Sequence, residues 1–237
     1  MTEEEKVMAL AGSIDEPDQA AIAAARERQS VLAKVPGSLG KLEDISIKIA
    51  GITGKVKDND VRKQCVAIMC ADNGVVAEGV ASAPQSVTQS QTINFTRRIT
   101  GVSSQARYFG IDLLVTDVGV AMDIPKDLYT DEMNTPDGGI PIQIVNRRLE
   151  NGTRDLAVEP AMTREQAVKA ILVGFEAADA MKKAGVQLCG IGEMGIGNTS
   201  TASAVTAVYL QSGAEEVTGR GPLRASPRKT SSAAAAG

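Results

Sequence analysis

Histidine and tryptophan are absent from the sequence, and aromatic residues make up only 3% of it. Because histidine is the commonest general base and the commonest metal ligand, its absence leaves acid–base work mainly to carboxylates and argues against a metal site. The net charge of -4 and the shortage of aromatic rings provide neither the basic stripe nor the stacking platforms of a nucleic-acid-binding protein. We therefore expect no metal and no nucleic acid among its ligands.

Cysteine is scarce and long apolar runs are missing, and both observations bear on the compartment. Cys65, Cys70 and Cys189 are odd in number and lie in apolar surroundings, so reduced core thiols are expected instead of disulfides or metal ligands. No apolar stretch reaches the roughly 18 residues that span a membrane, and the acidic start MTEEEKVMALAGS lacks the basic and apolar regions of a signal peptide. These features indicate a cytoplasmic protein with no membrane partner.

Segments typical of strands and helices alternate along the chain, whose 43% hydrophobic and 23% charged residues are ordinary for a globular protein. Short apolar runs predict buried parallel strands at 65–70, 111–115 and 186–191. Capping residues, helix formers and helical spacing predict helices at 17–29, 41–54, 86–109 (one or two, interrupted near Gly101), 163–183 and 201–213. The sequence therefore predicts an α/β fold with a mainly parallel, Rossmann-like sheet flanked by helices.

Composition divides the chain into three parts. Residues 1–60 are expected to form the N-terminal helical segment of a small domain, and residues 61–218 an α/β core. From Thr218 onward the sequence TGRGPLRASPRKTSSAAAAG holds one leucine, several basic residues and a Ser/Ala tail, so it cannot supply a buried strand. Residues 219–237 are therefore expected to be an unstructured tail, and the globular sequence to stop before the fold is complete.

A glycine-rich loop between a predicted strand and a predicted helix carries the sharpest local signal. The segment 190–201 reads GIGEMGIGNTST, in which glycines let the backbone approach a ligand. Asn198, Thr199 and Ser200 are expected to cap the helix and to add polar donors. Because unpaired N–H groups and the helix dipole favour an anion, the loop predicts a phosphate site.

Other interpretations of this loop remain open. Its glycines can serve a tight strand-to-helix turn for packing alone. Gly190, Gly192 and Gly195 also match the dinucleotide pattern GxGxxG, which is weak evidence by itself, and no GK[ST] follows, so a P-loop is excluded. Glu193 would repel a nearby phosphate unless it faced a sugar hydroxyl or a cationic ring, so we interpret it as a ribose or ring contact.

The segment GEMGIGNTSTA (192–202) resembles the most distinctive part of the nicotinate-nucleotide:dimethylbenzimidazole phosphoribosyltransferase family. Four further segments resemble that family in the same order, and the similarity covers roughly residues 15–221. They are PGSLGKLED (36–44), CADNGVVAEGVASAPQSVTQ (70–89), TDVGVA (116–121) and EPAMTREQA (159–167). Where many members have ADHGV, this chain has ADNGV at 71–75, which accounts for part of the missing histidine.

The resemblance implies an enzyme that transfers phosphoribose from nicotinate mononucleotide to 5,6-dimethylbenzimidazole, giving α-ribazole 5′-phosphate and nicotinate for the lower ligand of cobalamin. It implies no cofactor and a homodimer. The chemistry fits the composition, because nicotinate leaves from a glycosidic nitrogen that is already cationic and needs no general acid or metal. The incoming benzimidazole must lose its N–H proton, so a carboxylate base near the acceptor is useful.

The resemblance also implies substrate-binding residues, all from the segments quoted above. The base pocket is expected to involve Ser82, Pro84 and Gln89. Asp72 and Asn73 are possible strand-end contacts, although a buried turn residue would look the same. The ribose phosphate is expected to be held by Gly192, Glu193, Met194, Gly195, Gly197, Asn198, Thr199 and Ser200.

Family members continue past the segment 219–221 with further strands, a phosphate-contacting lysine and the glutamate proposed as general base. Nothing in 222–237 resembles that part, so we expect the C-terminal part of the family fold to be missing, no catalytic residue in this chain, and little or no turnover. The competing interpretations are a non-catalytic protein that binds a nucleotide or base, an NAD-dependent oxidoreductase, and a misfolded fragment whose exposed apolar surface makes it insoluble.

Overall fold

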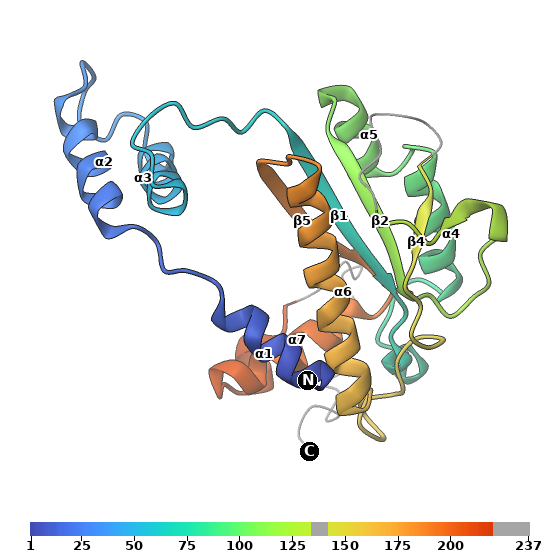
Figure 1. The fold of residues 1–237 in the computed structure, drawn as a ribbon. Helices are drawn as coiled ribbons and strands as arrows, with labels where there is room; N and C mark the ends of the chain where they lie inside the picture. The colour runs from blue at the N-terminus through green and yellow to red at the C-terminus, as the bar shows by residue number, and fades with distance from the viewer. Residues whose placement is uncertain (134–141, 220–237) are drawn as a thin grey trace. The chain divides into compact units, whose positions relative to one another are not determined.

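The computed structural model describes residues 1–133 and 142–219 (Figure 1). They divide into two compact units, Met1–Lys63 and Gln64–Gly237, which are described one at a time. Among the described residues, no helix is both long enough and apolar enough to cross a membrane. The predicted unstructured tail, 219–237, lies outside the described residues except for Gly219.

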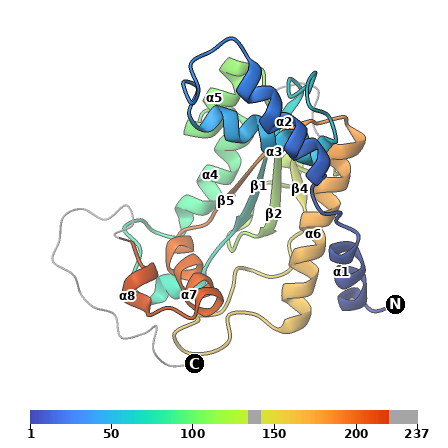
Figure 2. The ribbon, with the colours of Figure 1, turned by 90° about the vertical axis from the view of Figure 1, so that its left-hand side faces the viewer.

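The N-terminal unit contains three helices: α1 (Glu3–Gly12), α2 (Gln19–Val31) and α3 (Lys41–Thr53). The predicted α2 and α3 are confirmed. Asp18 caps α2 by accepting the Ala21 N–H, and α3 ends at Gly54, whose φ of 67° is left-handed. The two helices pack closely (Figure 2), because Gly51 leaves room for Ile22 where a Cβ atom would lie 2.7 Å from Ile22 Cγ1.

The second unit is built on a five-stranded sheet in which every pair of neighbours is parallel. Its order is β3-β4-β2-β1-β5. The strands are β1 (Gln64–Ala71), β2 (Asp112–Gly119), β3 (Tyr129–Thr130), β4 (Ile144–Asn146) and β5 (Leu188–Met194). The predicted α/β class and the three predicted strands are therefore confirmed, while β3 and β4 were not predicted.

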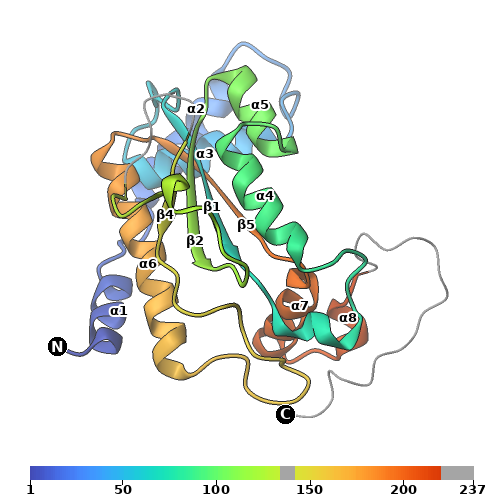
Figure 3. The ribbon, with the colours of Figure 1, turned by 90° about the vertical axis from the view of Figure 1, so that its right-hand side faces the viewer.

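Helices cover both faces of this sheet. The stretch 86–109 forms two helices, α4 (Ser86–Thr96) and α5 (Gly101–Phe109), on one face, and α6 (Arg164–Lys183) covers the other (Figure 3). The capping box predicted for α6 is present, since Thr163 and Gln166 bond reciprocally. The chain also forms α7 (Asn198–Leu210), α8 (Ala214–Val217) and the 3₁₀ turns η1 (Gly74–Glu78) and η2 (Lys126–Leu128).

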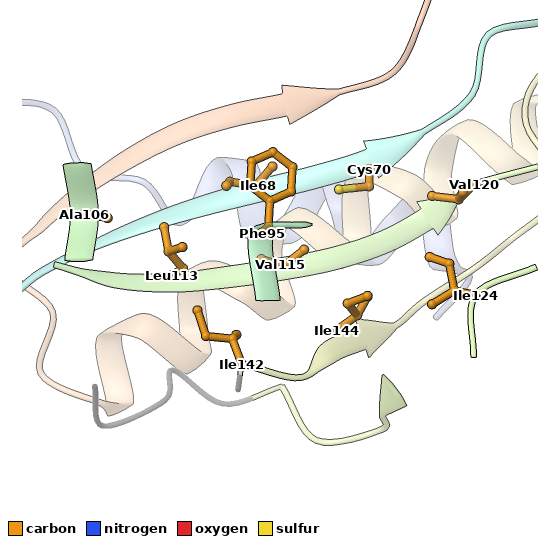
Figure 4. Packing of buried hydrophobic residues seen from close by; sticks show 10 residues of the cluster. All are labelled: Ile68, Cys70, Phe95, Ala106, Leu113, Val115, Val120, Ile124, Ile142 and Ile144. Atoms are coloured by element: carbon orange, nitrogen blue, oxygen red, sulfur yellow. The ribbon is translucent and has the colours of Figure 1, made fainter. Parts of the chain in front are cut away.

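Alternate strand residues fill two separate cores. On the face of α4 and α5, Phe95 and Ala106 pack over Ile68, Leu113 and other side chains of β1, β2 and β4 (Figure 4). On the opposite face, residues of α6 pack on the intervening strand positions, namely Cys65, Ala67, Leu114 and Val145. This alternation follows from the period of two in a strand, and it fixes which side chains reach the carboxyl edge of the sheet.

The cysteines are free thiols, but only two of them lie in the core. Cys65 and Cys70 are buried, and burial raises the pKa of each thiol to about 12. The expectation of a core position is wrong for Cys189, which is exposed. The reason is topological: Cys189 lies on β5, which pairs with β1 on one side and is the last strand in the sheet order.

Candidate functional site at the carboxyl edge of the sheet

Three loops converge where β1, β2 and β5 end. β1 lies between the other two strands, so its exit at Asp72-Asn73 lies between the β2 exit at 119–121 and the glycine loop that follows β5. In open α/β sheets, ligands bind outside the carboxyl ends of the strands. The predicted site residues of the loop and of the strand end are therefore brought to the same edge.

Two glycines of the loop are required by its packing on the end of β1 and on the turn η1 that follows it. A Cβ atom at Gly195 would overlap the carbonyl oxygen of Ala71, the last residue of β1. Gly197 has a φ of 86°, and a Cβ atom there would lie 2.8 Å from Val76 Cγ2. The loop therefore rests directly on the end of β1, which only residues without a side chain allow.

The backbone of Ile196, between these glycines, is held from two sides. The Ile196 N–H donates to Thr88 Oγ1 at 3.0 Å, and the Ile196 carbonyl accepts from Asn73 Nδ2 at 3.2 Å. Asn73 Oδ1 in turn accepts from the Thr201 hydroxyl at 2.9 Å, which ties the first turn of α7 to the β1 exit. Asn73, predicted as a possible ligand contact, thus bonds the loop itself in this structure.

The helix α7 begins differently from the prediction. Its N-cap is Gly197, which has no side chain to bond a helix amide, so the expected capping by Asn198, Thr199 and Ser200 is wrong. The side-chain amide of Asn198 instead donates a hydrogen bond to the carboxylate of Glu193, which lies near the end of β5. The Asn198 and Ser200 N–H groups bond Gly195 and Gly197 carbonyls, whereas the exposed Thr199 N–H has no acceptor in the described chain.

The dinucleotide pattern does not have the geometry of its motif. Gly190 and Gly192 lie inside β5 and pair with β1, and only Gly195 lies in the turn. A dinucleotide fingerprint requires its glycines in the turn between strand and helix, where the pyrophosphate approaches the backbone. Glu215 and Glu216, which have the spacing of the ribose-binding acid, lie in α8 and not at the end of a strand.

Asp72 is completely buried at the β1 exit. Its Oδ2 accepts the Ala121 N–H at 2.8 Å. Its Oδ1 is buried without a hydrogen-bond partner among the described residues. Burial raises the pKa of Asp72, and its interactions with Ala121 and Thr88 offset only part of that rise. Asp72 thus faces protein groups on several sides.

The predicted base-pocket residues lie in and before α4. Ser82 and Pro84 are exposed in the segment that leads into this helix. Gln89, half-buried, immediately follows Thr88 in α4, and its Nε2 donates to the Asp123 carbonyl beyond β2. The glycine loop is therefore bonded to Thr88, the residue of α4 that immediately precedes Gln89.

Three polar residues near this edge were not predicted as site residues. Asp117 is fully buried and accepts the Gly119 and Val120 N–H groups at 2.9 and 2.7 Å, and it also accepts the Tyr129 hydroxyl. Burial, and then Asp117, raise the pKa of Tyr129. Arg148 donates to the Ala121 carbonyl at 2.9 Å. The segment TDVGVA had drawn attention to Asp117, but no sequence signal marks Tyr129 or Arg148.

Comparisons with known proteins agree on one family. A family model described as phosphoribosyltransferase matches residues 14–230. The chain is 44% identical over 204 residues to the nicotinate-nucleotide–dimethylbenzimidazole phosphoribosyltransferase of Clostridium perfringens, covering 86% of this chain and 52% of that protein. It is also 44% identical over 196 residues to the protein of the same name from Acetivibrio thermocellus, covering 83% and 51%.

A solved structure resembles the fold as well. The crystal structure of CobT from Thermus thermophilus superposes with a TM-score of 0.74 and 38% sequence identity, covering 85% of this chain and 56% of that one. The chain thus spans about half the length of the curated relatives that it matches.

Proposed function

The chain belongs to the nicotinate-nucleotide–dimethylbenzimidazole phosphoribosyltransferase family, as its motifs predicted, and on that premise we propose that it binds nicotinate mononucleotide and a benzimidazole-type base for phosphoribosyl transfer between them. The observation that carries the proposal is the glycine loop, which presents the start of α7 at the carboxyl edge of the sheet. The products would be α-ribazole 5′-phosphate and nicotinate, in the synthesis of the cobalamin lower ligand.

We propose that the donor phosphate lies at the start of α7. The Thr199 N–H and the positive end of the helix dipole favour an anion there, and the hydroxyls of Thr199 and Ser200 are additional donors. Glu193, held by Asn198, is exposed beside this position. Its carboxylate is suited to a ribose hydroxyl or to the pyridinium ring of the donor, and both would be bound by the segment 192–200.

The acceptor base is proposed to lie beside α4, near Ser82, Pro84 and Gln89. Departure of nicotinate from a cationic nitrogen needs no acid, and attack from the opposite side inverts the anomeric centre from β to α. The acceptor proton needs a base. The family's general-base glutamate has no counterpart in this sequence, so we propose that this polypeptide alone binds ligands with little or no turnover.

Product formation tests the proposal directly. The purified polypeptide, and a fusion that appends the unmatched C-terminal half of the Thermus thermophilus protein, are incubated with nicotinate mononucleotide and dimethylbenzimidazole. We expect both to bind the mononucleotide, and only the fusion to release nicotinate. Comparable turnover by the short polypeptide would show that another carboxylate acts as base. Absence of mononucleotide binding by both, or tighter binding of NADH, would contradict the proposed function.

A homodimer, which rests on the family resemblance, and a cytoplasmic location, which rests on the sequence features described above, complete the proposal. Sedimentation of the purified protein at several concentrations tests the first, with a monomer at all of them as the contradicting result. Fractionation of the source cells tests the second.

A further inference from the structure

The glycine loop is fixed through the two consecutive peptide groups on either side of Ile196, which are bonded to different elements. The Ile196 N–H donates to Thr88 of α4, and the Ile196 carbonyl accepts from Asn73 at the exit of β1. Figure 3 shows the N-terminal end of α4 beside the start of α7. Because α7 starts two residues after Ile196, the orientation of these two peptide groups sets the orientation of the first α7 amides.

Thr88 holds the peptide group between Gly195 and Ile196 from the protein interior. The residue is completely buried, although it is polar. A hydroxyl has one donor and two acceptor positions. Its oxygen accepts the Ile196 N–H at 3.0 Å, so the hydroxyl ties the loop after β5 to α4.

We infer that Thr88 is a positioning residue for donor binding. Its hydroxyl holds the peptide group between Gly195 and Ile196, and through it the α7 amides, in the orientation that receives the donor phosphate. The inference rests on the function proposed above, since it assigns the phosphate to the start of α7. Thr88 itself touches no ligand, because its side chain is enclosed by protein.

The same helix supplies a matched control. Thr92, one turn later, is as fully buried as Thr88, and its hydroxyl donates to the Thr88 carbonyl within α4 at 2.8 Å. Thr92 makes no hydrogen bond to the loop. Valine has nearly the shape of threonine, so each replacement removes one buried hydroxyl group from α4. Comparing the two variants separates loss of the loop contact from destabilisation of the helix.

The test uses Thr88→Val, Thr88→Ser and Thr92→Val in the full chain. Titration calorimetry measures the dissociation constants of nicotinate mononucleotide and of dimethylbenzimidazole, and NMR measures hydrogen exchange of the Ile196 amide. For Thr88→Val we expect mononucleotide binding to weaken about tenfold, equivalent to about 1.4 kcal/mol. Affinity for dimethylbenzimidazole should stay within about twofold, because the Gln89 contact to Asp123 does not involve Thr88.

Exchange of the Ile196 amide should accelerate at least tenfold in Thr88→Val, because its acceptor is gone. Thr88→Ser, which keeps the hydroxyl, should restore both binding and protection, and Thr92→Val should alter neither. The inference would be overturned if Thr88→Val lost affinity equally for both ligands. It would also be overturned if Thr92→Val lost as much affinity for the mononucleotide. If the parent chain binds no mononucleotide, the proposed function fails. In that case unchanged exchange in Thr88→Val would independently refute the role of Thr88.

Discussion

Gly195 lies so close to Ala71 that a Cβ atom at Gly195 would overlap the Ala71 carbonyl oxygen. The glycine loop is therefore built onto the end of β1, and its shape is a property of the protein before any ligand arrives. The sequence left open whether the glycines serve packing or a phosphate site. The two roles are compatible, because the loop that packs closely on β1 also places the start of α7 at the carboxyl edge of the sheet.

Gly195→Ala should destabilise the protein by about 1–3 kcal/mol, because backbone must move to admit the methyl group. It should also weaken mononucleotide binding, since the loop shifts away from β1. Thermal unfolding and calorimetric titration measure the two effects. Gly190→Ala is the control, since its Cβ would lie at an ordinary 3.4 Å from Val66 Cγ2. Equal stability of the two variants would contradict the close packing at Gly195.

Asn73→Ala should release the loop from the β1 exit. It removes the donor to the Ile196 carbonyl and the acceptor of the Thr201 hydroxyl, and each partly buried group left unpaired costs about 1–3 kcal/mol. Denaturant unfolding measures the loss. Asn73→His, which brings in the residue that many family members have there, should retain most of the stability. An alanine variant as stable as the parent would show that the two hydrogen bonds of the Asn73 amide do not hold the loop.

Asp72→Asn should change the pH dependence of stability in a defined direction. Burial raises the pKa of Asp72, so the folded chain holds the proton more tightly than the unfolded chain does. The free-energy cost of the buried charge therefore appears as the pH rises above about 4, and the free energy of unfolding falls as Asp72 ionises. The neutral, isosteric variant avoids this cost, so its stability relative to the parent should grow between about pH 4 and pH 7.

Urea unfolding of parent and Asp72→Asn at several pH values measures that difference, and other titrating groups cancel in it. A difference that does not vary with pH would mean that Asp72 titrates alike in the folded and unfolded chains. A parent that gains on the variant as pH rises would reverse the sign and contradict the burial argument.

The three thiols should react at different rates. Cys189 is exposed on β5, whereas burial of Cys65 and Cys70 raises each pKa to about 12 and leaves almost no thiolate near neutrality. An aromatic disulfide reagent at pH 8 should therefore modify one thiol per native chain and three after unfolding. Cys189→Ser should abolish the fast reaction, and its persistence in that variant would show that the core opens readily.

Long, regular elements of this fold could be predicted from the sequence, and short ones could not. The apolar run 65–70 and the capping box at Thr163 and Gln166 are local patterns that specify a strand and a helix start without tertiary contacts. Both predictions are confirmed. β3 and β4 have two and three residues, too few to show a period of two. β4 exists because β2 offers it a partner, and β3 pairs in turn with β4. The helix α1 was missed although Thr2 and Glu5 form a capping box, because its apolar pattern is weak.

The site shows the same division. Motifs marked the glycine loop and the exit of β1, but not what each side chain bonds. Asn198 lacked its predicted capping role because Gly197, in a left-handed conformation, takes the cap position. Thr88 and Arg148 reach the site through tertiary contacts across more than twenty residues of sequence, and no local pattern encodes such contacts.

The strand β5 ends the sheet on the side away from β1, and the described residues place no strand beside its outer edge. Leu188 and the almost fully exposed Ile191 lie on it, and no lysine or proline interrupts Leu188–Met194. Such an edge is a template for another extended chain. We therefore expect self-association through β5 to increase with protein concentration, which is the variable to control in any preparation of this polypeptide.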